Sequence, residues 1–351
     1  MICINASINA VAGRPPIRPA GHVIGARDRW DHVLARWGVN RGGHRVEPGL
    51  YALGGPNPDS PVFVTANYTL SFDAVRQALA GIDGYLLVLD TRGVNVWCAA
   101  GKGTFGTDEL VRRMEATALG EVVRHRVVIL PQLGATGVAA HEVERRSGFE
   151  VEYGPVRASD LRQYLETRRA TPAMRRVRFT LADRLTLIPV ELVHALIPLA
   201  VASAGAYLLG GMLAAVGVAT ALLAGAVLFP ILLPWLPTRD FSTKGFILGG
   251  LAAVPFILAA LLAGPGPANP GPAGAPLAWP LRVGWAAAYL LALPSVTAYL
   301  ALNFTGSTPF TSRTGVRREI FTYIPVMAWT FGAGVVLAVA LALIQVLGGG
   351  S

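Results

Sequence analysis

The pattern of apolar and polar positions divides the chain into two halves of different character. Residues 1–184 alternate short apolar runs with charged and polar segments, whereas residues 185–347 are almost free of charge. The first pattern is typical of a water-soluble domain, and the second is typical of helices that cross a membrane. We therefore predict an α/β domain followed by an all-α transmembrane domain.

Within the first half, residues 61–67, 85–90 and 126–131 are short apolar runs that predict buried strands. Helical patterns are expected over residues 72–80, 108–118, 138–147 and 159–169, with Ser71 and Thr107 as N-caps of the first two. Strands that alternate with helices indicate a mostly parallel sheet, whose ligands lie beyond the carboxyl ends of the strands. Loops there are rich in Thr, Ser, Asn and Gly, which suits a polar ligand with a phosphate. The chain has neither a dinucleotide-binding glycine motif nor a P-loop motif.

Five apolar stretches follow, each long enough to cross a hydrocarbon core of about 30 Å as a helix. They cover residues 187–208, 211–236, 246–264, 283–301 and 321–347. The connections 237–245 and 302–320 carry basic residues, whereas 265–281 carries no charge. The positive-inside rule then places the N-terminal domain in the cytoplasm and the C-terminus outside, in a multi-pass protein of the inner membrane.

Glu191 and His194 are ionisable residues near the start of the first apolar stretch, and their spacing places them on one helix face. Intramembrane ionisable groups often handle protons or metals. A hydrogen-bonded pair at the cytoplasmic edge, which only fixes helix packing, is the simpler interpretation.

Net charge and cysteine count change the picture in two ways. The formal charge is +9, but arginines gather between residues 168 and 184, just before the first apolar stretch. A juxtamembrane patch facing anionic lipid explains this placement, and no pattern for nucleic-acid binding is evident. The two cysteines, Cys3 and Cys98, are too few for a disulfide framework or a four-cysteine cluster. No secretory signal peptide is expected at the start of the chain.

Cys98 lies in the segment 94–103, which starts with polar residues and ends with glycines. If Asn95 caps a helix, Val96 is its first residue and Cys98 its third, where the helix dipole favours a thiolate. Lys102 follows four residues later on the same face, and the small Ala99 and Ala100 would let a planar macrocycle approach. The pattern would equally allow a strand end, and a Cys beside Trp97 is most often a core residue.

The sequence Asn95-Val-Trp-Cys-Ala-Ala-Gly-Lys102 resembles the cap-helix motif of the HgcA family, the corrinoid proteins of bacterial mercury methylation. Residues 65–73, 131–137 and 303–312 are similar to segments shared with the large subunit of the corrinoid iron–sulfur protein of the acetyl-CoA pathway. The five-span tail resembles HgcA and not that subunit, and no cysteine cluster is present. The resemblance implies an α/β corrinoid-binding domain with a cap helix.

The resemblance also implies the cofactor and its site. Cys98 would be the catalytic residue and would bind the cobalt of a cobalamin-type corrinoid. The corrinoid would be held by Asn95, Val96, Trp97, Cys98, Ala99, Ala100, Gly101, Lys102, Thr65, Asn67, Ser71, Gln132, Gly134, Ala135, Thr136, Gly137 and Val138.

By the same resemblance, the chain is a corrinoid-dependent methyltransferase that passes a cobalt-bound methyl group to Hg(II) and forms methylmercury. Its partners would be a methyl-donor pathway enzyme, a ferredoxin-like iron–sulfur reductant of the HgcB type and the lipid bilayer. Electron donation by a thiolate suits methyl transfer to an electrophile. Two alternatives are a membrane-tethered methyl carrier for acetyl-CoA synthesis and a transporter or binding module. The expected organisation is 1–170 corrinoid domain, 171–186 basic linker, 187–347 five spans and 348–351 an appended linker.

Overall fold

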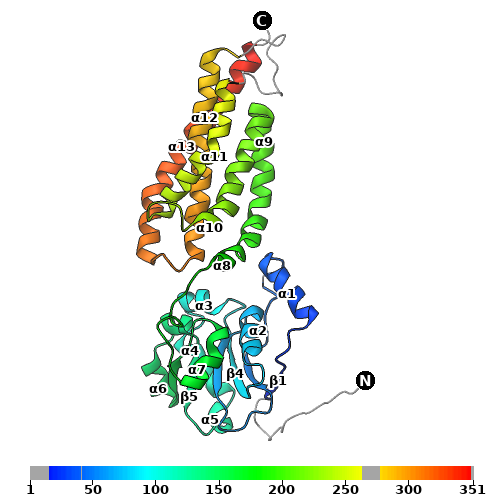
Figure 1. Ribbon diagram of the computed structural model, residues 1–351, viewed down its shortest axis with the longest axis vertical. Coiled ribbons are helices and arrows are strands. Elements are labelled where there is room, and N and C mark those ends of the chain that lie inside the picture. The colour runs from blue at the N-terminus through cyan, green and yellow to red at the C-terminus, as the bar shows by residue number, and fades with distance from the viewer. Residues whose placement is uncertain (1–15, 41, 263–276, 349–351) are drawn as a thin grey trace. The chain divides into compact units, whose positions relative to one another are not determined.

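The computed structural model describes residues 16–40, 42–262 and 277–348 (Figure 1). Cys3 and residues 265–276 of the uncharged connection 265–281 lie outside the described residues. The chain forms two compact units, Met1–Arg178 and Phe179–Ser351. Each unit has its own hydrophobic core.

The first unit is built on a six-stranded sheet in the order β1-β2-β4-β3-β5-β6. The strands are β1 (Arg18–Ala20), β2 (Gly49–Leu53), β3 (Val62–Ala66), β4 (Gly84–Leu89), β5 (Val127–Leu130) and β6 (Glu150–Tyr153). All neighbouring pairs are parallel except β2 and β4. The predicted mostly parallel sheet is thus confirmed, and its three predicted strands are β3, β4 and β5.

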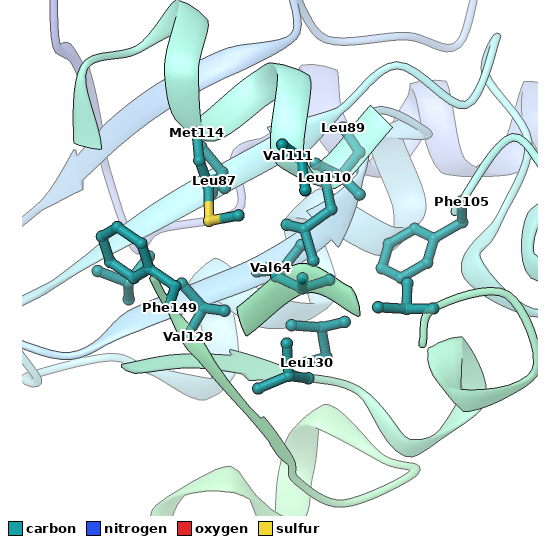
Figure 2. Close-up of a cluster of buried hydrophobic side chains, with 14 of the residues drawn as sticks. Val64, Leu87, Leu89, Phe105, Leu110, Val111, Met114, Val128, Leu130 and Phe149 are labelled. Carbon is teal, nitrogen blue, oxygen red and sulfur yellow. The ribbon is translucent and has the colours of Figure 1, made fainter. Parts of the chain in front are cut away.

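Helices cover both faces of this sheet. They are α1 (Ala26–Arg36), α2 (Thr69–Ala78), α3 (Val96–Lys102), α4 (Thr107–Ala116), α5 (Leu119–Val122), α6 (Ala140–Ser147) and α7 (Leu161–Thr167), with short 3-10 turns η1 (Gln132–Thr136) and η2 (Ala158–Asp160). Figure 2 shows Leu110, Val111 and Met114 of α4 packed against Val64 and Leu87 of the strands. A second cluster, on the other face, joins α2 and α7 to the sheet. Burial of these apolar side chains is the main force that holds the layers together.

Two predicted helix caps are wrong. α2 begins at Thr69, so Ser71 is its third residue and does not cap it. α4 begins at Thr107 itself, with Gly106 in the cap position. The Thr107 hydroxyl instead accepts a hydrogen bond from the backbone N–H of Ala139 at 2.9 Å. The Thr107 hydroxyl therefore makes a tertiary hydrogen bond in place of a local capping hydrogen bond.

The second unit is all helical. It contains α8 (Leu181–Leu185), α9 (Ile188–Leu223), a π-helical stretch η3 (Ala224–Leu228), α10 (Phe229–Leu232), α11 (Phe241–Leu262), α12 (Trp279–Asn303), η5 (Phe304–Ser307) and α13 (Arg313–Gly348). Within the described residues, four helical runs are long and apolar enough to cross a membrane: Leu181–Leu232, Phe241–Leu262, Trp279–Ser307 and Thr314–Leu347.

The five predicted apolar stretches fall within four continuous helical runs. The first two predicted stretches belong to one run, Leu181–Leu232, which is interrupted by non-helical backbone at Gly210 and Gly211. Gly211 has φ 68°, a conformation that glycine adopts without steric cost. The run folds back at this point, because Arg184 near its start donates a hydrogen bond to the carbonyl of Ile231 near its end. The run therefore consists of two helical legs.

α11 and α12 approach each other closely through small residues. A Cβ atom on Gly245 would lie 2.5 Å from Cα of Ala298, and one on Gly249 would lie 2.7 Å from Cα of Pro294. Small residues at such crossings are characteristic of helix pairs in membranes. Lys244, expected in a basic connection, lies inside α11, where it is buried and donates to the carbonyls of Leu233 and Leu236.

Candidate functional site

The candidate site lies at the carboxyl edge of the parallel strands. β3, β4 and β5 run in the same direction, so the loops that follow them meet at one edge of the sheet. These loops contain Asn67 after β3, residues 90–95 after β4 and η1 after β5. α3, which carries Cys98, follows the loop after β4 and packs on η1.

The predicted cap of α3 is confirmed. Asn95 is the N-cap residue, Val96 the first helical residue and Cys98 the third. The side-chain oxygen of Asn95 accepts a hydrogen bond from the backbone N–H of Cys98 at 2.9 Å. Gly103 ends the helix in the left-handed conformation, with φ 84°. Cys98 is thus held in a short helix that is fixed at both ends.

The two faces of α3 have different roles. Val96, Ala99 and Ala100 are buried in the core beneath the helix, whereas Cys98 is half-buried and Trp97 is 40% exposed. Lys102 is exposed, one turn after Cys98. The outer face therefore presents a thiol, an indole ring and a cation. The Trp97 ring is too exposed to be part of the core.

Ala99 and Ala100 do not provide the flat surface that was expected for a macrocycle. They face the protein, and their small size allows η1 to approach the helix. A Cβ atom on Gly137 would lie 3.0 Å from Cα of Ala100 and 2.2 Å from the carbonyl oxygen of Phe105. One on Gly134 would lie 2.6 Å from the Phe105 ring. The glycines of this loop thus permit close packing under α3.

Asn67 organises the loop that leads to α3. Its side chain is 2% exposed, and its oxygen accepts hydrogen bonds from the backbone N–H groups of Thr91 and Gly93, each at 3.0 Å. The hydroxyl of Thr91 lies 2.9 Å from the same oxygen, and the amide nitrogen donates to Asp90 at 3.3 Å. The oxygen of Asn67 accepts three hydrogen bonds and its nitrogen donates one, so the side chain positions the loop that leads to α3.

The remaining predicted site residues are dispersed. Thr65 is buried inside β3, and Ser71 is half-buried in α2. The side-chain oxygen of Gln132 accepts a hydrogen bond from Arg175 at 2.6 Å. Within and after η1, Val138 is buried, Ala135 is half-buried and Thr136 is exposed. The structure brings residues 95–102 and 132–138 together, whereas Thr65 is buried in β3 and Ser71 belongs to α2.

Sequence reasoning missed the residues that support the loop from below. Asp90 accepts a hydrogen bond from the backbone N–H of Arg92 at 3.0 Å. The backbone N–H of Asp90 donates to Glu109 of α4 at 2.8 Å, and Glu109 also pairs with Arg113. The Asp-Thr-Arg-Gly sequence is a recognisable turn signal. Nothing in the local pattern distinguishes Glu109 from an ordinary acidic residue of a first helical turn.

A single half-buried thiol has limited coordinating capacity. Among the described residues, no group of three or more His, Cys, Asp or Glu side chains could hold a metal ion. A metal bound by Cys98 would therefore take most of its ligands from elsewhere, as a cobalt ion does in a corrin ring. The outward thiol and the exposed indole and cation beside it fit such a ligand, whose ring could approach from the solvent side.

The other predicted ionisable pair lies in the second unit. Glu191 and His194 line a cavity of about 590 Å³ between α9, η3, α12 and α13. Most of its wall is apolar, and Tyr299 and Asn303 supply further polar groups. The predicted shared face of the pair is confirmed. The structure does not assign a chemical role to this cavity.

The first unit contains a segment that matches a known protein family. Residues 40–165 match the family described as CO dehydrogenase/acetyl-CoA synthase delta subunit. The chain is 37% identical over 124 residues to the acetyl-CoA decarbonylase/synthase complex subunit gamma of Archaeoglobus fulgidus, covering 35% of this chain and 26% of that protein. It is 38% identical over 123 residues to the same subunit of Methanopyrus kandleri, covering 34% and 26%.

A third relative is named for its cofactor. Over 119 residues the chain is 34% identical to the corrinoid/iron-sulfur protein large subunit of Moorella thermoacetica, covering 33% of this chain and 26% of that protein. The chain thus spans about a quarter of the length of these curated relatives. The family match ends at residue 165, so it excludes the apolar helices and residues 303–312. The family match is therefore to one segment of the chain, and this segment includes Cys98 and α3.

Proposed function

We propose that this chain is a membrane-anchored corrinoid protein that carries a methyl group, with Cys98 as the ligand of the cobalt. The observation that supports it most strongly is the Asn95-capped Cys98 at the carboxyl edge of the sheet. This cysteine lies within residues 40–165, the segment that matches the CO dehydrogenase/acetyl-CoA synthase delta subunit family. When bound, a corrinoid supplies a cobalt centre that accepts a methyl group and passes it on.

The residues around Cys98 would hold its thiolate in place. The backbone N–H of Cys98 is bound to Asn95, which fixes the first turn of α3 and hence the direction of the side chain. Lys102 adds positive charge on the same face, and the exposed Trp97 offers an aromatic surface beside the thiol. Soft sulfur would donate electron density to a metal bound by Cys98 and would thereby assist release of a methyl group from it.

Two acceptors for the methyl group fit this site. The names of the relatives favour a carrier of the acetyl-CoA-pathway type, which would deliver methyl to an acetyl-CoA synthase. A specific feature favours Hg(II) as a second candidate: the thiol is carried in the segment Asn95–Lys102 that resembles the mercury-methylating HgcA family. A strongly donating thiolate suits transfer of methyl to an electrophilic metal ion.

Partners follow from what the described residues contain. The described residues contain no group of side chains that could bind an iron–sulfur cluster. Electrons for the cobalt would therefore come from a separate ferredoxin-like iron–sulfur protein of the HgcB type. A methyl-donor pathway enzyme would load the carrier. The apolar helices would anchor it in the cytoplasmic membrane, with the first unit inside and, by charge distribution, the C-terminus outside.

Anaerobic reconstitution of the full chain with corrinoid, reductant and a methyl donor tests this proposal and separates the acceptors. Methylated protein is offered either Hg(II) or an acetyl-CoA synthase, and methylmercury or acetyl-CoA is measured. We expect Cys98→Ala to lose transfer and Cys3→Ser, which removes the other thiol, to retain it. Equal transfer by Cys98→Ala and wild type would refute the ligand role. Transfer to the synthase alone would exclude mercury as the acceptor.

A further inference from the structure

α1 is attached to the first unit by its charged face. Arg76 of α2 donates to Asp73 at 2.6 Å and to Asp28 of α1 at 2.9 Å. His32 of α1 lies 2.7 Å from the other oxygen of Asp73. Arg76 also donates to two backbone carbonyls that precede α1. In a water-soluble domain the apolar face of a helix normally packs inward, whereas α1 directs its charged face inward.

The face of α1 that points to solvent carries the large apolar residues. Trp30 is 63% exposed, Val33 is 40% exposed and Trp37, which follows the helix, is 45% exposed. Their spacing of three and seven residues places them along one stripe. We call these three residues the α1 stripe. Together they form an exposed aromatic surface that water solvates poorly.

Basic side chains flank the α1 stripe. Arg27, Arg29 and Arg36 are all exposed. The acidic residues Asp28 and Asp31 lie on the inner side, where they are bound to Arg76 and His44. The outer surface of α1 therefore combines tryptophan with positive charge. This combination is typical of helices that lie in the plane of a membrane interface.

We propose that α1 lies on the anionic surface of the bilayer, with the α1 stripe inserted among the lipid headgroups. Charge complementarity supports this occupant, because arginines attract anionic phospholipids. The covalent connection also holds the first unit near the bilayer, because the first apolar run begins at Leu181, shortly after the first unit ends at Arg178. The family match begins at residue 40, so α1, like the apolar helices, lies outside the segment that is shared. This role is independent of the corrinoid.

The full chain in lipid nanodiscs provides the test. Val33→Cys is labelled with an environment-sensitive fluorophore in a Cys3→Ser, Cys98→Ser background, which leaves both tryptophans in place. Nanodiscs contain either phosphatidylcholine alone or phosphatidylcholine with phosphatidylglycerol, and a fraction of the lipid carries a quencher. The matched control is a label at Arg145→Cys on α6, which packs on the opposite face of the sheet from α2.

We expect lipid quenching at position 33 to exceed that at position 145 by roughly fivefold in anionic nanodiscs, and to fall in phosphatidylcholine alone. Trp30→Glu with Trp37→Glu should reduce quenching at position 33 to the control level. Both tryptophans are exposed, so these changes leave the core intact.

Three results would overturn the proposal. Quenching at position 33 equal to the control would show that α1 does not meet lipid. Protection from an aqueous quencher without lipid quenching would mean that protein covers the α1 stripe. Quenching that is unaffected by the double glutamate variant would show that the tryptophans do not hold α1 on the bilayer.

Discussion

Asn95 shows how one side chain can determine where a reactive group points. Its amide accepts the hydrogen bond of the Cys98 N–H, so the cap and the candidate ligand form one local unit. This contact was predictable, because Asn is a preferred N-cap and the helix that follows is short. The role of Asn67 was not predictable, because its partners lie more than twenty residues away in sequence.

Asn95→Ala should loosen α3 without unfolding the first unit. Loss of an N-cap costs about 1 kcal/mol, which corresponds to roughly fivefold faster exchange of the amide hydrogens in α3. Hydrogen exchange followed by mass spectrometry on the full chain measures this. Asn95→Asp retains a capping oxygen and should exchange like wild type. Unchanged exchange in the alanine variant would contradict the assigned cap.

At the scale of elements, the close packing of α3 on η1 requires positions without side chains at the contact. Gly137→Ala would place a Cβ atom 2.2 Å from the carbonyl oxygen of Phe105, which is backbone and can only move with its segment. We expect the variant to destabilise the first unit by about 1–3 kcal/mol. Thermal unfolding followed by circular dichroism checks this. Gly55→Ala, where a Cβ atom meets nothing within 4 Å, should have little effect.

The attachment of α1 should depend on acid. The backbone N–H of Gly25 and the guanidinium of Arg76 hold the pKa of Asp28 below its usual value of 3.8, although partial burial opposes them. Because the pKa of Asp28 is lower in the folded protein than in the unfolded chain, the ionised carboxylate stabilises the attached helix above pH 3.8. This stabilisation is lost as the pH falls through the pKa that Asp28 has in the folded protein. The protection of the α1 amide hydrogens from exchange, corrected for the pH dependence of the intrinsic exchange rate, should therefore be constant above about pH 5. It should decrease below about pH 3.8.

Asp28→Asn separates this contribution from other acid effects. It removes the carboxylate but retains the size of the side chain, so α1 should be less protected at neutral pH and less sensitive to acid. Asp59→Asn, which affects an exposed pair with Arg124, is the control and should leave α1 unchanged. An α1 that is equally protected in both variants would show that the ion pair with Arg76 does not hold the helix.

For the whole molecule, sequence patterning predicted the two-part organisation but not every element. β3, β4 and β5 were predicted because each is a continuous apolar run. β2 was missed because its sequence, Gly-Leu-Tyr-Ala-Leu, contains glycine and alanine, which are depleted in strands. The continuity of the first apolar run, Leu181–Leu232, was also not predicted. Hydropathy shows two stretches there, and only the structure shows how the chain continues through Gly210 and Gly211.

The proposed orientation in the membrane gives a prediction for the whole chain. A fluorescent protein fused after Ser312 should fold and fluoresce, because that connection carries Arg313, Arg317 and Arg318 and is expected in the cytoplasm. Alkaline phosphatase fused after Leu347 should be active, because the C-terminus is expected outside. A fluorescent fusion at both positions would contradict this orientation.

The central claim is that the sulfur of Cys98 bonds to cobalt. X-ray absorption spectroscopy at the cobalt edge, on the full chain loaded with corrinoid, tests it most directly. The account predicts a sulfur neighbour of cobalt in wild type and in Cys3→Ser, and none in Cys98→Ala. A wild-type spectrum without a sulfur neighbour, or one unchanged in Cys98→Ala, would contradict it.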